Sequence, residues 1–106
     1  MTHVTTHILD ATAGTPAAGV DVSLQSADGT PQGSGRTDAD GRLALGPEAL
    51  EPGDYALTFA TGDYFAAQGV AAFHPSVTIA FTVADRPHYH VPLLLSPFAY
   101  TTYRGS

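Results

Sequence analysis

The chain has 106 residues, a length that fits one domain of ordinary size. Hydrophobic residues make up 43% of it and charged residues 13%, a balance that excludes an intrinsically disordered chain. A net charge of −6, with only four basic residues, leaves no basic surface for nucleic acid or an anionic membrane. The absence of cysteine excludes disulfides and thiolate metal sites. We therefore expect one soluble, cytoplasmic domain over residues 1–106, with neither a nucleic-acid nor a membrane partner.

In chain order, the sequence reads as short β-segments separated by glycine and proline. Residues 4–10 alternate, so His7 shares a face with Thr5 and Leu9, opposite the apolar Ile8. Further strands are expected at residues 19–26, 42–45, 54–61, 76–83, 88–95 and 99–103, with one short helix at 64–70. Short strands recurring at this spacing favour an all-β antiparallel sandwich or barrel.

The segment at residues 88–95 places two histidines on one strand face. His88 and His90 are two positions apart and share that face with Pro92 and Leu94. We expect the opposite face to be core because it carries no ionisable group; its residues are Tyr89, Val91, Leu93 and Leu95. Pro92 requires an edge position or a bulge. An outward face that mixes histidine with apolar residues indicates a partly dry cleft or a subunit interface.

The histidine pair has two other interpretations. His88 could be a surface residue with no role, since exposed histidines are common. Alternatively, His88 and His90 could chelate a metal with His7 as a third ligand, as in three-histidine zinc sites. No Asp, Glu or Cys lies nearby in sequence to complete such a site, so we predict no metal. His3 and His74 look structural or incidental.

Arg42 is the most interesting of the few cations. It follows a turn at residues 37–41 and begins a strand. It could pair with Asp38 or Asp40 in solvent, or it could hold an anion or an imide edge with its planar fork. Spacing alone does not decide between these roles. Arg36 and Arg86 lie in turn-like stretches, which favours a structural role for both.

Several segments, taken together and in order, resemble one known family. The most specific are Thr6-His7-Ile8-Leu9-Asp10, the segment His88-Tyr89-His90-Val91-Pro92-Leu93-Leu94-Leu95-Ser96-Pro97, and the terminal Tyr103-Arg104-Gly105-Ser106. The turn and arginine at residues 37–42 and the segment 61–65 match as well. The chain is similar to the 5-hydroxyisourate hydrolases, the enzymatic branch of the transthyretin family, over nearly its whole length.

The resemblance implies a transthyretin-like sandwich of two antiparallel sheets with one short helix, assembled as a homotetramer, a dimer of dimers. It implies hydrolysis of the six-membered ring of 5-hydroxyisourate to 2-oxo-4-hydroxy-4-carboxy-5-ureidoimidazoline in urate degradation, in a channel between dimers. His7, Arg42 and His90 would be catalytic, without metal or cofactor. The residues implied to bind this purine-derived substrate are His7, Arg42, Tyr103, Ser106 and His88.

The alternative is a non-catalytic carrier that binds a small ligand in the same channel. Transthyretin itself has no matching Tyr-Arg-Gly-Ser terminus and lacks the channel histidines, so the resemblance favours the enzyme. In that case His7 or His90 would activate a water molecule, because histidine titrates near neutral pH. The sequence does not tell which of the two is the base.

Overall fold

A computed structural model describes residues 2–106; Met1, part of the predicted domain, lies outside the described residues. Within this range the chain forms nine strands and one helix. The strands are β1 (Val4–Asp10), β2 (Thr15–Pro16), β3 (Asp21–Ser26), β4 (Pro31–Arg36), β5 (Arg42–Leu45), β6 (Gly53–Phe59), β7 (Val77–Val83), β8 (Tyr89–Leu95) and β9 (Tyr100–Thr102), and the helix is α1 (Thr61–Ala66). This all-β composition with one short helix confirms the predicted class.

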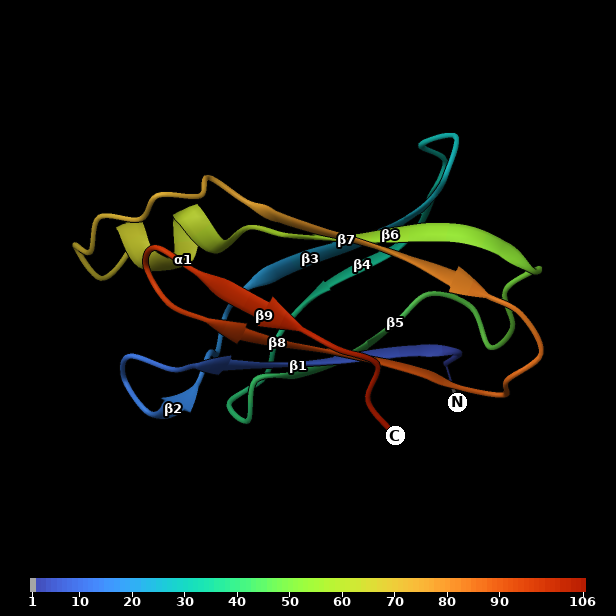
Figure 1. Cartoon of the computed structure of the whole chain (residues 1–106), viewed down its shortest axis with the longest axis horizontal. Helices are drawn as coiled ribbons and strands as arrows, with labels where there is room; N and C mark the ends of the chain where they lie inside the picture. Colours follow the sequence, from blue (N-terminus) through green and yellow to red (C-terminus); the bar gives the residue numbers. More distant parts are fainter. Residues whose placement is uncertain (1) are drawn as a thin grey trace.

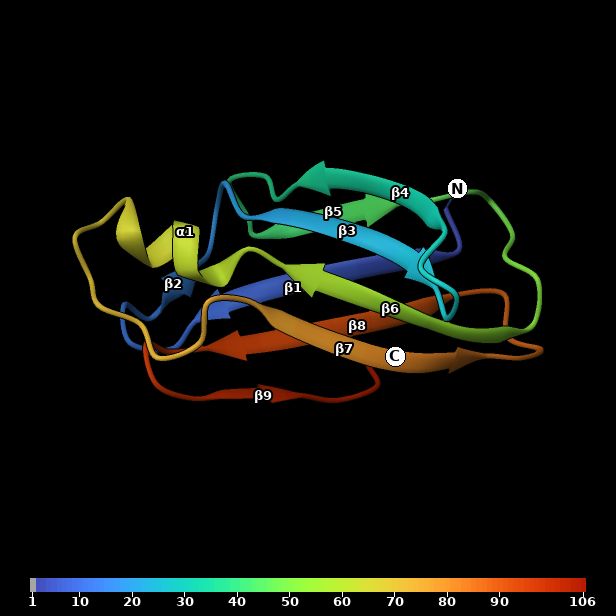
Figure 2. The ribbon, with the colours of Figure 1, turned by 90° about the horizontal axis from the view of Figure 1, so that it is seen from above.

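The strands form two sheets that face each other (Figure 1). The first has the order β2-β1-β8-β9, with β5 also paired to β1, and the second has the order β4-β3-β6-β7. Turned by 90°, the molecule shows α1 at the same end as β2 (Figure 2). Beyond β9 the chain continues to its C-terminus (Figure 1 and Figure 2), and Gly105 forms an antiparallel bridge with His90 of β8.

The core lies between the sheets and follows from the period-two alternation of the strands. Ile8 of β1, Leu24 of β3 and Leu57 of β6 are almost completely buried. The face of β8 that we predicted to be core is buried at every position; its residues are Tyr89, Val91, Leu93 and Leu95. The opposite face of β8 therefore points away from the core, as predicted for the two histidines.

One pairing departs from a purely antiparallel sandwich. β1 and β8 run parallel over seven residue pairs, from Val4 with Tyr89 to Asp10 with Leu95. The first sheet is thus mixed. Pro92 lies on β8, which is an inner strand. On the β9 side, the pairing of β8 covers residues 93–95 and then stops, and it resumes only at the bridge between His90 and Gly105. The proline occupies this interruption, so the ladder loses no hydrogen bond.

Three local predictions were wrong or displaced. Residues 31–36, which were not among the predicted strands, form β4, although proline and glycine are poor strand formers. Glycine is needed there, because a Cβ on Gly33 would lie 2.7 Å from the backbone nitrogen of Gly46. The helix occupies 61–66 rather than 64–70, and Gly69, at φ 69°, turns the chain beyond it. The preceding strand correspondingly ends at Phe59 rather than at residue 61.

Within residues 2–106, no helix is long and apolar enough to span a membrane.

Candidate active site

Strand register brings the predicted residues of β1, β5 and β8 onto one outward face. His7 is opposite Arg42 of β5 on one side and Pro92 of β8 on the other. Thr5, two residues earlier on β1, is opposite His90. Because alternate residues share a face, the side chains of Thr5, His7 and His90 project on the same side of the sheet.

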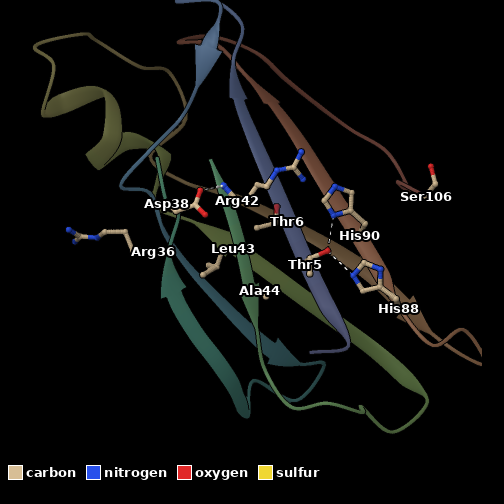
Figure 3. A pocket seen from close by; sticks show the side chains of 10 residues that line it. All are labelled: Thr5, Thr6, Arg36, Asp38, Arg42, Leu43, Ala44, His88, His90 and Ser106. Carbon is tan, nitrogen blue, oxygen red and sulfur yellow. Dashed lines mark hydrogen bonds between the residues drawn. The ribbon is translucent and has the colours of Figure 1, made fainter. Parts of the chain in front are cut away.

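This face is hollowed over a volume of about 580 Å³ (Figure 3). Four of the predicted site residues line the hollow: Arg42, His88, His90 and Ser106. The other lining residues are Thr5, Thr6, Arg36, Asp38, Leu43 and Ala44. The hollow is therefore a mixed surface of imidazoles, two guanidiniums, a carboxylate, hydroxyls and small apolar groups, and it is open to solvent on the single chain.

His7 lies next to the hollow without lining it. Its ring is half-buried, and Nε2 donates a hydrogen bond of 2.9 Å to the backbone carbonyl of Asp40. A carbonyl can only accept, so Nε2 carries the proton and the neutral ring keeps its lone pair on Nδ1. The loop before β5 thus fixes both the orientation and the tautomer of His7.

His90 is the predicted residue most perturbed by its surroundings. Half-burial lowers the pKa of its imidazole below the ordinary histidine value, and electrostatic repulsion from the neighbouring His88, Arg42 and His7 side chains acts in the same direction. His90 is thus held as a neutral imidazole at neutral pH, which is the state that can accept a proton.

Arg42 is not neutralised by the acidic turn that precedes it. The Asp38 carboxylate accepts hydrogen bonds from the backbone nitrogens of Asp40 and Arg42, at 2.9 and 3.0 Å. Among residues 2–106, no carboxylate forms an ion pair with the Arg42 guanidinium, which extends toward His90 in Figure 3. Its charge is therefore available to a ligand in the hollow.

Arg36 takes the structural role that we expected for it. Its guanidinium binds both carboxylate oxygens of Asp21, at 2.8 and 3.2 Å. The prediction of a turn-like position was wrong, since Arg36 ends strand β4. The exposed pair lies at the margin of the hollow and helps to hold β4 to β3.

The C-terminal segment divides the predicted tail residues between two surfaces. The backbone nitrogen of Gly105 donates to the His90 carbonyl at 2.9 Å, which brings Ser106 to the hollow. Tyr103 is 58% exposed and lies with Arg104 on a second hollow of about 440 Å³, between β7 and β8. On the single chain, the structure therefore does not bring Tyr103 together with Arg42.

Sequence reasoning missed two residues that touch the histidines. Thr5 places its hydroxyl 2.8 Å from a ring nitrogen of both His88 and His90. Gly105 approaches so closely that a Cβ there would lie 2.5 Å from Cδ2 of His90. The alternation of β1 placed Thr5 on the face of His7, as predicted, but nothing local in the sequence pairs it with β8.

The remaining histidines play the structural roles expected. His3 is buried; its Nδ1 accepts from the backbone nitrogen of Leu50 and its Nε2 donates to the carbonyl of Arg86, both at 2.8 Å. His74 contacts the rings of Phe73 and Tyr100. In the part of the chain that the structure describes, no three His, Asp or Glu side chains are grouped to hold a metal ion.

This arrangement has the parts needed to hydrolyse a cyclic amide or imide. A neutral imidazole with a lowered pKa can take a proton from water. An unpaired guanidinium can hold a carbonyl edge and stabilise negative charge that develops on its oxygen. The geometry thus provides a base and an oxyanion-stabilising group on one surface.

Comparison with known proteins identifies the family. A sequence model described as the HIUase/Transthyretin family matches residues 4–105. A 5-hydroxyisourate hydrolase of Mesorhizobium japonicum is 46% identical, over 97% of this chain and 91% of its own length. The structure of Klebsiella pneumoniae 5-hydroxyisourate hydrolase is 42% identical, with a TM-score of 0.90 over 97% of this chain and 98% of that one.

A transthyretin is also among the similar solved structures. Sea bream transthyretin, solved in complex with thyroxine, is 35% identical, with a TM-score of 0.88 over 97% of this chain and 94% of that one. These matches extend over nearly all of the chain and confirm the resemblance found in its motifs. The chain therefore belongs to the HIUase/Transthyretin family.

Proposed function

We propose that this protein is a hydrolase that opens the six-membered ring of 5-hydroxyisourate. Two lines of support favour this activity over the carrier alternative. The hydrolases named above are more similar in sequence than the thyroxine-binding relative, at 46% and 42% identity against 35%. The hollow also holds a neutral imidazole beside an unpaired guanidinium, a pairing with a clear catalytic use.

In the proposed reaction, water attacks a ring carbonyl while His7 or His90 accepts its proton. A new C–O bond forms, the C–N bond of the ring breaks, and the proton passes to the departing nitrogen. Arg42 holds the substrate and stabilises the charge on the carbonyl oxygen. Ser106 and His88 contact the substrate from the rim of the hollow. The placement of His90 and the unpaired Arg42 guanidinium in one hollow is the single observation that carries this assignment. The lowered pKa of His90 supports it, because an uncharged imidazole has a lone pair that can accept a proton.

We further propose that residues 1–106 act as one domain and assemble into a homotetramer. The hollow is open on one chain, and apolar side chains lie exposed near it, including Leu94 of β8 at 36% and Tyr103, just beyond β9, at 58%. Burying them against another copy would exclude water from the hollow and bring a second Tyr103 toward it. A soluble cytoplasmic location without nucleic-acid or membrane partners agrees with the net charge of −6.

The experiment is the decay of 5-hydroxyisourate, generated fresh from urate with urate oxidase and followed by ultraviolet absorbance. If the protein is a hydrolase, adding it should make the intermediate disappear faster. If it is a carrier, the rate of spontaneous decay should not change. Replacing His7, Arg42 or His90 with alanine should lower turnover about 10²–10⁴-fold. His74→Ala is the matched control, since His74 lies outside the hollow and should keep normal turnover. Normal turnover in all three site variants would refute the assignment.

A further inference from the structure

The hydroxyl of Thr5 lies between two histidines of the hollow. Its Oγ1 is 2.8 Å from Nε2 of His88 and 2.8 Å from Nδ1 of His90. Strand register fixes this position, because Thr5 on β1 is the direct partner of His90 on β8. The two imidazole rings lie on either side, with their centroids 6.3 Å apart (Figure 3).

A hydroxyl has one proton to donate, so this contact links the protonation of the two rings. Thr5 can donate to His88 while it accepts from Nδ1–H of His90, or it can donate to His90 while it accepts from Nε2–H of His88. The first arrangement leaves the lone pair of neutral His90 on Nε2, and the second leaves it on Nδ1. The hydrogen bond on one ring nitrogen thus decides which nitrogen of His90 can act as a base.

The surroundings of His90 favour the first arrangement. Gly105 covers the Cδ2 edge of the ring and Thr5 occupies Nδ1, so Nε2 is the nitrogen left for a ligand. Arg42 lies close enough to His90 for its positive charge to be felt at the ring. A nearby cation attracts a lone pair and repels an N–H dipole, so an unprotonated Nε2 on that side is the better electrostatic match.

We propose that Thr5 is a positioning residue that holds the proton of His90 on Nδ1, with His88 accepting the Thr5 hydroxyl, so that His90 Nε2 is the base of the reaction. This inference rests on the proposed function and deepens it, because it chooses between the two candidate bases. It also gives His88 a role that requires no contact with the substrate. His7 is unsuited to the same task at Nε2, which is committed to the Asp40 carbonyl.

The test compares Thr5→Val and Thr5→Ser. Valine keeps the shape of threonine and favours strands, so the fold should persist while the hydroxyl is lost. Serine keeps the hydroxyl. Thr58→Val is the matched control. It removes a threonine hydroxyl from β6 of the second sheet, away from the hollow, where that hydroxyl bonds to Thr78 of β7. Far-ultraviolet circular dichroism and the mass in solution verify that each variant is folded and assembled.

Two measurements are needed. Nitrogen-15 NMR of the histidine rings, assigned with His88→Gln and His90→Gln, reports which nitrogen of His90 carries the proton without any substrate. We expect protonated Nδ1 in the original protein and in Thr5→Ser, and a shift toward protonated Nε2 in Thr5→Val. In the decay assay, Thr5→Val should lower kcat about 10–100-fold with little change in KM, and Thr5→Ser should restore most of it.

The outcomes separate this inference from the proposed function. If the original protein does not accelerate decay, the proposed function fails, and the NMR result still tells whether Thr5 sets the tautomer. If the protein is active but Thr5→Val keeps the His90 tautomer or the normal kcat, the positioning role is overturned. An equal loss in Thr5→Ser or in Thr58→Val also overturns it, since the hydroxyl would then not be the cause.

Discussion

The close approach of Gly105 to His90 gives a sharp prediction for Gly105→Ala. A Cβ at this position would lie 2.5 Å from Cδ2 of His90 and 3.1 Å from Cγ of Pro92. Carbon atoms prefer a separation of about 3.5–4.0 Å, so the ring or the tail must move by about 1 Å. A displacement of that size at a reacting group costs about 10²-fold in rate. We therefore expect kcat/KM for 5-hydroxyisourate to fall about 100-fold in the decay assay.

Stability should change much less than activity in this variant. The contact that is lost with the tail is the hydrogen bond from Gly105 to the His90 carbonyl, worth about 1 kcal/mol. Gly29→Ala is the control: at φ 88° with no atom near its Cβ position, it should cost about 1–2 kcal/mol of unfolding free energy and leave kcat/KM unchanged. Normal kinetics for Gly105→Ala would refute the packing of the tail against His90.

Three further predictions address charge and packing. Arg42→Gln removes a positive charge that lowers the pKa of His90, so NMR titration should find this pKa raised toward its ordinary value; an unchanged titration would contradict the contact. Tyr64→Phe leaves the buried carboxylate of Asp10 without its 2.9 Å hydroxyl donor and should cost about 1–3 kcal/mol in urea unfolding, with normal kcat. Leu57→Ala, in the centre of the core, should cost about 2–5 kcal/mol in the same measurement, and a cost below 1 kcal/mol would argue against the sandwich core.

Much of the fold could be predicted because strand alternation is local. The boundaries of β1 and β5 and the buried face of β8 follow from period-two patterns that each segment carries by itself. Segment 31–36 was missed because a residue far along the sequence explains its glycine. The backbone of Gly46 packs so closely against Gly33 that there is no room for a side chain there. The parallel pairing of β1 with β8 was missed for the same reason, since no local pattern encodes which strands become neighbours.

The site was predicted in part, through motifs rather than geometry. The outward direction of His88 and His90 followed from strand alternation. The functional role of Arg42 followed from the resemblance to the family. Thr5 was overlooked because its importance comes from its register with β8, about 85 residues later in the chain. The position of Tyr103 on a separate hollow was equally unreadable, because it depends on the path of the tail past Pro92.

The most direct test of the site is a crystal structure with a slowly reacting cyclic imide related to the proposed substrate. We predict that the imide occupies the hollow beside β1 and β8, with a carbonyl oxygen on the Arg42 guanidinium and Nε2 of His90 facing the carbonyl carbon. An imide bound instead on the hollow of Tyr103 and Arg104, which His90 also lines, with no contact to Arg42, would contradict this placement.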